Sequence, residues 1–266
     1  MITGNTHFAI ATHVFVEDCG PDDPEVYPGA TEQCDGRKTD CDNTNWDDDA
    51  GLMSFEHADG AWTLLAGGTE DKPATIDLDE EGTLRVCDGA FYVQLTASAD
   101  VSIEGDDATE TVLHGGGEAP VLDVVADGIT VSLRGVTLRG GAGAPTTVSE
   151  LVYNAGGGLR CLVDAEVSLT EVAIQDNRAD LGAGALLAWG CRARFNEVSF
   201  NDNDAAVYGG GLLATEVEQL TLNNTDFVGN MANQAGGGVI LLDARAQITG
   251  GVFSSNASTA GVGLAV

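Results

Sequence analysis

Closely spaced acidic residues near the start of the chain have the types and spacing that could do chemistry. Residues 17–49 contain 12 acidic side chains against two basic ones. Hard cations such as Ca²⁺ take about six to eight oxygen ligands, which a short Gly-containing loop can supply from carboxylates and backbone carbonyls. The sequence therefore predicts a Ca²⁺ site built from Asp18, Asp22, Asp23, Asp35, Asp40 and Asp42. The alternative is a solvated acidic linker with a disulfide, because this segment is too polar to form a core of its own.

The same segment resembles a metal-binding repeat of bacterial secreted proteins. The resemblance lies in Asp18, Cys19 and Asp23, in Pro28–Glu32 (PGATE), in Cys34–Gly36 (CDG) and in Asp40–Asp42 (DCD). The chain departs from the repeat where further acids or a glycine are expected, at Gly20, Pro21, Arg37, Lys38, Thr39 and Asn43. The resemblance implies a metal-binding module from which several ligands are missing.

A second set of carboxylates occurs in a repeated part of the chain. Asp176 and Asp202 occupy equivalent positions, because each directly precedes a recurring Asn. Glycosidases use two carboxyl groups about 5 to 9 Å apart, so an extracellular polysaccharide lyase or glycosidase is the alternative function. The same position continues as Gly229 and Ser255, and His does not occur after position 114. We therefore expect no catalytic residues and a non-enzymatic role.

The elements that must position these side chains follow a fixed period. An Asn recurs at positions 177, 203, 230 and 256, each time three places after an Ile or Phe and before a Gly-rich cluster. A regular period of this length indicates a stacked repeat architecture. Segments such as LTLNNTDF alternate apolar and polar residues, which is typical of strands with one buried face. The sequence thus predicts an all-β fold, a right-handed parallel β-helix with coils of about 26 residues.

Stacking places equivalent residues of successive coils about 4.8 Å apart, so each repeated position becomes a ladder. An internal ladder is expected from Ile174, Phe200, Phe227 and Phe253. A turn ladder with amide-to-amide bonds is expected from Asn177, Asn203, Asn230 and Asn256, and Asn tolerates the left-handed backbone conformation. A leucine-rich repeat is the competing fold, although the Gly-rich return segments lack helix formers at a helical period.

The paired Phe-x-x-Asn and Gly-Gly-x-apolar patterns resemble the repeats of polymorphic outer membrane proteins, which are right-handed β-helix surface proteins of bacteria. YGGGLLA and AGGGVIL match well, whereas LGAGALL and AGVGLAV are degenerate. The resemblance implies a β-helix at an extracellular or outer-membrane location with a structural or adhesive role. The expected partner is an unidentified surface or carbohydrate molecule.

Charge and cysteine content agree with this extracellular location. The formal net charge of −31 disfavours nucleic acid and anionic membrane surfaces. Six cysteines without a Cys-x-x-Cys pair suit an oxidising compartment. Three of them lie in the acidic segment, and Cys87 is a possible mate for the odd one. The spacing between Cys161 and Cys191 does not match the coil period, so we expect buried thiols rather than a bridge.

Domain boundaries follow from these patterns. We expect a poorly defined N-terminus over 1–16, the acidic segment over 17–50, a cap over 51–75 and the β-helix over 76–266. Between positions 138 and 174 about ten extra residues predict a loop that stands off the stack. The start shows no basic signal-peptide region, no apolar run is long enough for a membrane span, and the last coil has no polar cap. We therefore expect part of a larger exported polypeptide.

Overall fold

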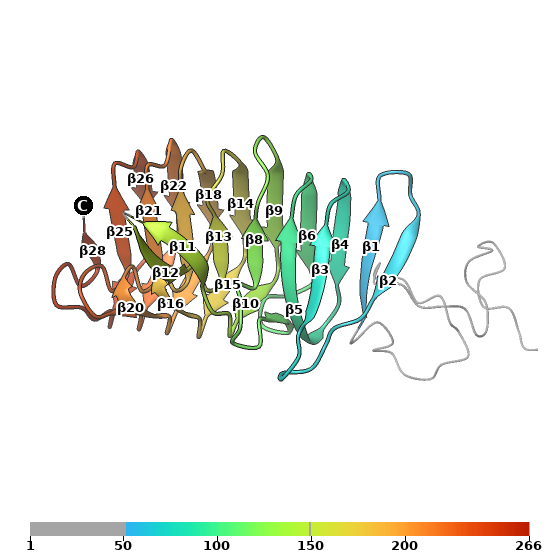
Figure 1. Ribbon diagram of the computed structural model, residues 1–266, viewed down its shortest axis with the longest axis horizontal. Helices are drawn as coiled ribbons and strands as arrows, with labels where there is room; N and C mark the ends of the chain where they lie inside the picture. The colour runs from blue at the N-terminus through green and yellow to red at the C-terminus, as the bar shows by residue number, and fades with distance from the viewer. Residues whose placement is uncertain (1–51, 149, 266) are drawn as a thin grey trace, which may run out of the picture.

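The computed structural model describes residues 52–148 and 150–265, and every regular element in these ranges is a β-strand. Successive strands stand side by side in an elongated stack, which runs from β4 to β28 in Figure 1. Seven consecutive parallel strands of one sheet, one from each coil, mark about seven coils. The fold is therefore the expected all-β parallel solenoid.

Two large sheets and one small sheet form the walls of the stack. The nine-stranded sheet contains, in spatial order, β2 (Trp62–Leu65), β1 (Met53–His57), β4 (Gly82–Val86), β6 (Val101–Gly105), β9 (Thr130–Arg134), β14 (Glu166–Thr170), β18 (Arg192–Asn196), β22 (Gln219–Asn223) and β26 (Ala246–Thr249). The five-stranded sheet contains β11 (Ala144–Val148), β12 (Leu151–Ala155), β16 (Arg178–Leu181), β20 (Asp204–Tyr208) and β24 (Met231–Ala232).

The fourteen-stranded sheet has two arms that meet at the long strand β5 (Gly89–Ala97). One arm contains β7 (Thr111–His114), β10 (Thr137–Arg139), β15 (Ala173–Gln175), β19 (Ser199–Asn201), β23 (Asp226–Val228) and β27 (Phe253–Ser254). The other contains β3 (Ala74–Leu78), β8 (Leu122–Val124), β13 (Leu159–Cys161), β17 (Ala185–Ala188), β21 (Leu212–Thr215), β25 (Val239–Leu242) and β28 (Leu264–Ala265).

The interior is filled by ladders of apolar side chains. Leu113, Leu138, Ile174, Phe200 and Phe227 follow one another in register, and all five are buried. The rings of Phe200 and Phe227 are stacked with centroids 4.7 Å apart. Phe253 continues the stack at 4.9 Å but is 36% exposed. The expected aromatic ladder is therefore present.

The asparagine ladder is also present, and its amides are fully used. Asn177 Nδ2 donates to Asn203 Oδ1 at 3.0 Å, and Asn203 Nδ2 donates to Asn230 Oδ1 at 2.9 Å. The same nitrogen of Asn203 also donates to the carbonyl of Ile174 in the preceding coil. Asn256 ends the series by accepting from Asn230. The side chains thus satisfy buried polar groups at a corner that strand pairing does not reach.

One detail of this corner differs from expectation. The left-handed residue is the one before each ladder Asn, with φ of 54° at Asp176, 52° at Asp202, 70° at Gly229 and 55° at Ser255. The ladder Asn is therefore selected for its two-sided amide rather than for tolerance of positive φ.

The repeated glycine triplets serve two purposes. Gly209, first in its triplet, has φ of 67°, which most residues adopt only with strain. At Gly211, last in that triplet, a Cβ would lie 2.6 Å from the carbonyl oxygen of Gly238 and 2.8 Å from the ring of Phe227. The first glycine therefore permits the turn, and the last permits close approach of the next coil.

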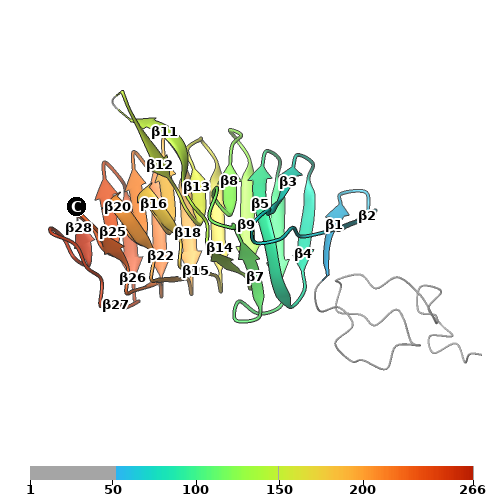
Figure 2. The same ribbon diagram turned by 60° about the horizontal axis from the view of Figure 1, so that its bottom comes forward.

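Two antiparallel additions interrupt the parallel stack. Strand β1 pairs antiparallel with both β2 and β4, so this hairpin covers the edge of the first coil. Strands β11 and β12 form a second hairpin, which leans out from the coils in Figure 2. The second hairpin accounts for the extra residues between 138 and 174. The expectation of a loop at this insertion was correct in position, but the segment is a paired hairpin.

The expectation for Cys161 and Cys191 was wrong, because the two residues form a disulfide with their Cα atoms 6.2 Å apart. Cys161 ends β13 and is in register with Leu187 of the next coil. The chain then turns through Trp189 and Gly190, and this turn brings Cys191 back to Cys161. The bridge therefore joins different positions of adjacent coils, which a count along the strands does not reveal.

Candidate functional site

The six aspartates predicted to bind Ca²⁺, at positions 18, 22, 23, 35, 40 and 42, lie outside the described residues. Within 52–148 and 150–265, no group of three or more His, Cys, Asp or Glu side chains is arranged to hold a metal ion. Cys87, at the first coil, is disulfide-bonded. The metal-binding prediction remains a prediction.

The outward face of the nine-stranded sheet carries a column of hydroxyl groups. The register places Thr83, Ser102, Ser132 and Ser168 on four neighbouring strands, β4, β6, β9 and β14. Parallel strands lie about 4.8 Å apart, so the hydroxyls recur at that interval along the stack. Ser132 Oγ donates to Ser102 Oγ at 3.0 Å. This face presents repeated neutral groups that both donate and accept hydrogen bonds.

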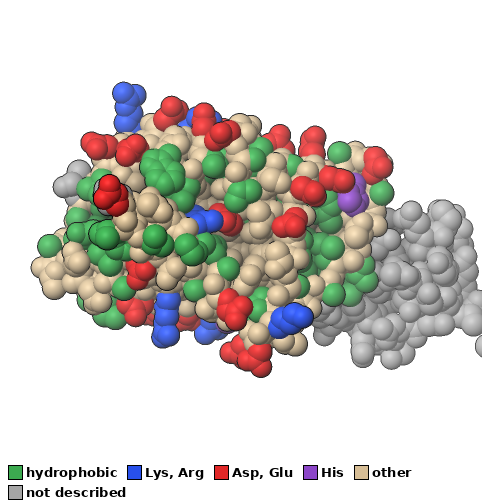
Figure 3. Space-filling model, viewed as in Figure 1, with side chains coloured by type: hydrophobic (Ala, Val, Ile, Leu, Met, Phe, Trp, Pro, Cys, Tyr) green, Lys and Arg blue, Asp and Glu red, His purple; other side chains and the backbone are tan. Residues whose placement is uncertain are grey.

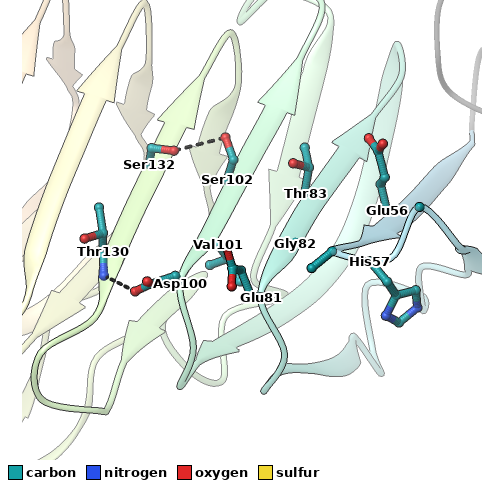
Figure 4. Close-up of a pocket in the computed structure, with 12 residues that line it drawn as sticks. Glu56, His57, Glu81, Gly82, Thr83, Asp100, Val101, Ser102, Thr130 and Ser132 are labelled. Atoms are coloured by element: carbon teal, nitrogen blue, oxygen red, sulfur yellow. Dashed lines mark hydrogen bonds between the residues drawn. The ribbon is translucent and has the colours of Figure 1, made fainter.

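A hollow of about 490 Å³ opens at the capped end of this face. Figure 4 shows Glu56, Thr83, Ser102 and Ser132 in one row across the strands, with Asp100 and Thr130 below. The Thr130 backbone N–H donates to Asp100 Oδ1 at 2.7 Å. The hollow is wide open to solvent and most of its lining residues are polar or acidic, which suits an extended hydrophilic ligand better than a small apolar molecule.

Charged side chains at the cap hold one another in place. Arg85 lies between Glu56 at 3.2 Å and Glu104 at 2.8 Å, and its guanidinium is 5.8 Å from the centroid of Trp62. His57 Nδ1 is 3.0 Å from Glu80, and its Nε2 is 2.8 Å from the hydroxyl of Thr63. Both nitrogens of His57 are thus engaged with residues other than the serine column. This arrangement does not form a serine–histidine relay.

A second groove, of about 550 Å³, contains the carboxylate pair from the repeats. Its polar lining includes Glu70, His114, Asp176, Arg178, Asp202 and Asp204. Asp176 is bound by Arg139 at 2.9 Å, and the two side chains are each about half exposed. The equivalent position in the next coil, Gly229, lies against the Asp202 carboxylate. The structure therefore brings the predicted pair into one groove, but Arg139 occupies one of the two carboxylates.

His114 stands at the corner of this groove in an earlier coil. The backbone N–H of Gly116 donates to His114 Nδ1 at 3.1 Å. Partial burial lowers the pKa of His114 below its ordinary value of 6.5, and the charge of Arg139 acts in the same direction. The ring is therefore neutral at pH 7 and can accept this bond.

Acidic side chains are prominent on the surface of the molecule (Figure 3). They gather along the upper margin of the molecule in Figure 3, where few basic side chains accompany them. Sequence reasoning predicted this charge but did not find the serine column or the His57 contacts. Alternation of polar residues marked the outward positions, yet only the register between coils of unequal length aligns Ser102 with Ser132 and Ser168.

Comparison with known proteins gives no match: neither a family model, nor a curated protein, nor a solved structure corresponds to this chain. In the described part of the chain, no helix is long and apolar enough to cross a membrane. The class that the geometry of the described residues defines is thus a parallel β-solenoid with a hydroxylated face and an acidic groove.

Proposed function

We propose that this chain is a non-enzymatic, exported or cell-surface β-helix that acts as a rigid adhesive or structural passenger. The observation that carries the proposal is the flat column of Thr83, Ser102, Ser132 and Ser168 on a stack whose interior is closed by apolar ladders. Such a face offers repeated neutral hydrogen bonds to an extended carbohydrate lying along the stack.

Two further features support an extracellular address. The Cys161–Cys191 disulfide is of a kind that persists in oxidising compartments. The Phe-x-x-Asn and Gly-Gly-x repeats resemble those of polymorphic outer membrane proteins. We also propose that the acidic segment over 17–50 binds Ca²⁺, on the strength of its resemblance to the secreted metal-binding repeat. Calorimetric titration of Ca²⁺ into the chelator-stripped chain tests this, and an Asp35, Asp40 and Asp42 to Asn variant should lose the binding.

The glycosidase or lyase alternative has a specific observation in its favour. Asp176, Asp202 and Asp204 share one groove with Arg178, and the backbones of adjacent coils are about 4.8 Å apart, close to the separation of the two carboxyl groups in retaining glycosidases. The Arg139–Asp176 ion pair weighs against it, because it removes one carboxylate from contact with substrate.

One experiment separates the two functions. The purified chain is run through gels that contain neutral or acidic polysaccharides, and the same mixtures are assayed for new reducing ends and unsaturated products. Retention without product is the expected result. Product formation that an Asp202→Asn variant abolishes would replace the proposal with the enzymatic alternative. A Ser102→Arg, Ser132→Arg variant should reduce retention if the serine column is the binding face.

A further inference from the structure

The turn between β17 and β18 contains an exposed tryptophan in an unfavourable conformation. Trp189 has φ of 55° and Gly190 has φ of 95°, while the Cys191 N–H donates to the Ala188 carbonyl at 3.2 Å. A four-residue turn with positive φ at both central positions is usually made by Asn-Gly or Asp-Gly. A bulky residue there is an outlier, and the Trp189 side chain is 47% exposed. Neither turn formation nor core packing accounts for this residue.

The surrounding structure holds this turn rigidly. Cys191 is bonded to Cys161, and the Gly190 N–H donates to the carbonyl of Glu216 in the next coil at 3.1 Å. The equivalent positions in the following two coils are Glu216 and Asp243, with φ of 53° and 48°. The same backbone shape thus carries a large aromatic ring in one coil and carboxylates in the next two. Strained residues that a structure over-determines cluster at functional sites.

Charged side chains lie next to this turn, in the same coil and in the next one. Arg192 Nη1 is 2.7 Å from Asp164 and 3.1 Å from Glu218, and hydrogen bonds to Glu218 and Asp164 raise the pKa of the guanidinium. A hollow of about 530 Å³ opens beside them, lined by Glu216, Val217, Glu218, Asp243 and Arg245. Because Glu216 accepts from Gly190 and Glu218 binds Arg192, the hollow adjoins the Trp189 turn.

We propose that Trp189 and this hollow form a subsite for a neutral sugar ring. The apolar C–H face of a pyranose packs on an aromatic ring, and its hydroxyls both donate and accept hydrogen bonds. The carboxylates of Glu216, Glu218 and Asp243 supply acceptors, and Arg245 supplies donors. Uronic acids are disfavoured by these carboxylates. The inference rests on the carbohydrate partner of the proposed function and assigns it a second contact, at a corner of the stack.

The test is a Trp189→Gly variant, because glycine adopts the required φ without strain and removes only the ring. Glu197→Gly is the matched control, since Glu197 has φ of 57° at a different corner. Wild type and variants are measured on an array of neutral gluco-, galacto-, manno- and xylo-oligosaccharides together with oligouronates. Thermal unfolding checks that each variant is folded.

The expected result is binding of a neutral oligosaccharide by wild type and by Glu197→Gly, with binding by Trp189→Gly roughly tenfold or more weaker. Trp189→Gly should unfold at the same temperature as wild type or higher. Equal binding by wild type and Trp189→Gly would refute the subsite and leave the carbohydrate role intact. Absence of wild-type binding to every sugar on the array would overturn both, and preference for oligouronates would overturn the neutral specificity.

Discussion

The coils before and after the β11–β12 hairpin share the two large sheets but complete the same corner with different residues. In the later coils this corner is Asn177, Asn203, Asn230 and Asn256. In the earlier coils the register places Gly116 and Gly141 at the same position. Gly141 donates its N–H to Asn177 Oδ1 at 2.8 Å, whereas Gly116 donates to the ring of His114.

This difference shows that the solenoid does not require the repeated Asn at this corner. Coils of regular length can stack identical amides, and each amide then serves its neighbours on both sides. The earlier coils vary in length. Far fewer residues separate the paired Leu84 and Ile103 than separate Ile103 from its partner in the next coil, Leu133. The corner positions stay in register there, but Gly116 and Gly141 have no side-chain amide to stack. These coils use glycine and an individual histidine contact instead.

Truncation of Phe227 should have the largest effect on stability. Phe227→Ala removes a fully buried ring stacked on both sides and should cost about 4 kcal/mol in the free energy of unfolding, measured by urea denaturation. Phe253→Ala is the control and should cost less than half as much, because its ring is stacked on one side and 36% exposed. Equal costs would show that the ladder does not stabilise its members jointly.

Loss of the Cys161–Cys191 disulfide should have the second-largest effect on stability. A Cys161→Ala, Cys191→Ala variant removes a cross-link between adjacent coils, and should lower the free energy of unfolding by about 3 kcal/mol. Wild type in reductant should shift by at least this amount, because the disulfide of Cys87 opens as well. If the variant were as stable as wild type, the stacked coils alone would constrain this junction.

Removal of one amide from the ladder should cost about 2 kcal/mol in the free energy of unfolding, because buried polar groups lose their partner. Asn203→Ala leaves the Asn177 N–H and the Ile174 carbonyl without their hydrogen-bond partner. Asn201→Ala is the control, because it loses one bond to Ser199 at the edge of the same turn and should be nearly as stable as wild type. If urea denaturation found both variants equally stable, the amide ladder would not distinguish the later coils from the earlier ones.

The smallest effect concerns the histidine that replaces the ladder. Because the pKa of His114 is lower in the folded chain than in the unfolded chain, protons bind the unfolded state more readily. Its contribution is therefore intact above pH 6.5 and is lost as the pH falls below that value. His114→Gln should flatten the stability profile between pH 7 and 5 by less than about 1 kcal/mol, given solvent screening. If the stability of His114→Gln varied with pH in parallel with that of wild type, His114 would be excluded as the source of this pH dependence.

The sequence was sufficient for the fold and for both ladders because a regular period maps each position onto itself in the next coil. It was insufficient where the structure brings together residues that its period did not align. The Cys161–Cys191 bridge and the alignment of Ser102 with Ser132 both depend on how chains of unequal length turn in space. The left-handed residues were assigned to Asn from its propensity, whereas backbone geometry places them one residue earlier, at Asp176 and Asp202.

The disulfide also has a mechanical consequence. A solenoid pulled from its two ends unravels coil by coil, since each coil is held only by its neighbours. The bridge between Cys161 and Cys191 shields the segment between them from the load. At about 3.4 Å per extended residue, the fully stretched chain is shorter by roughly 100 Å until the bridge is reduced. A tether at a cell surface would thus carry force through a covalent clamp within its stack.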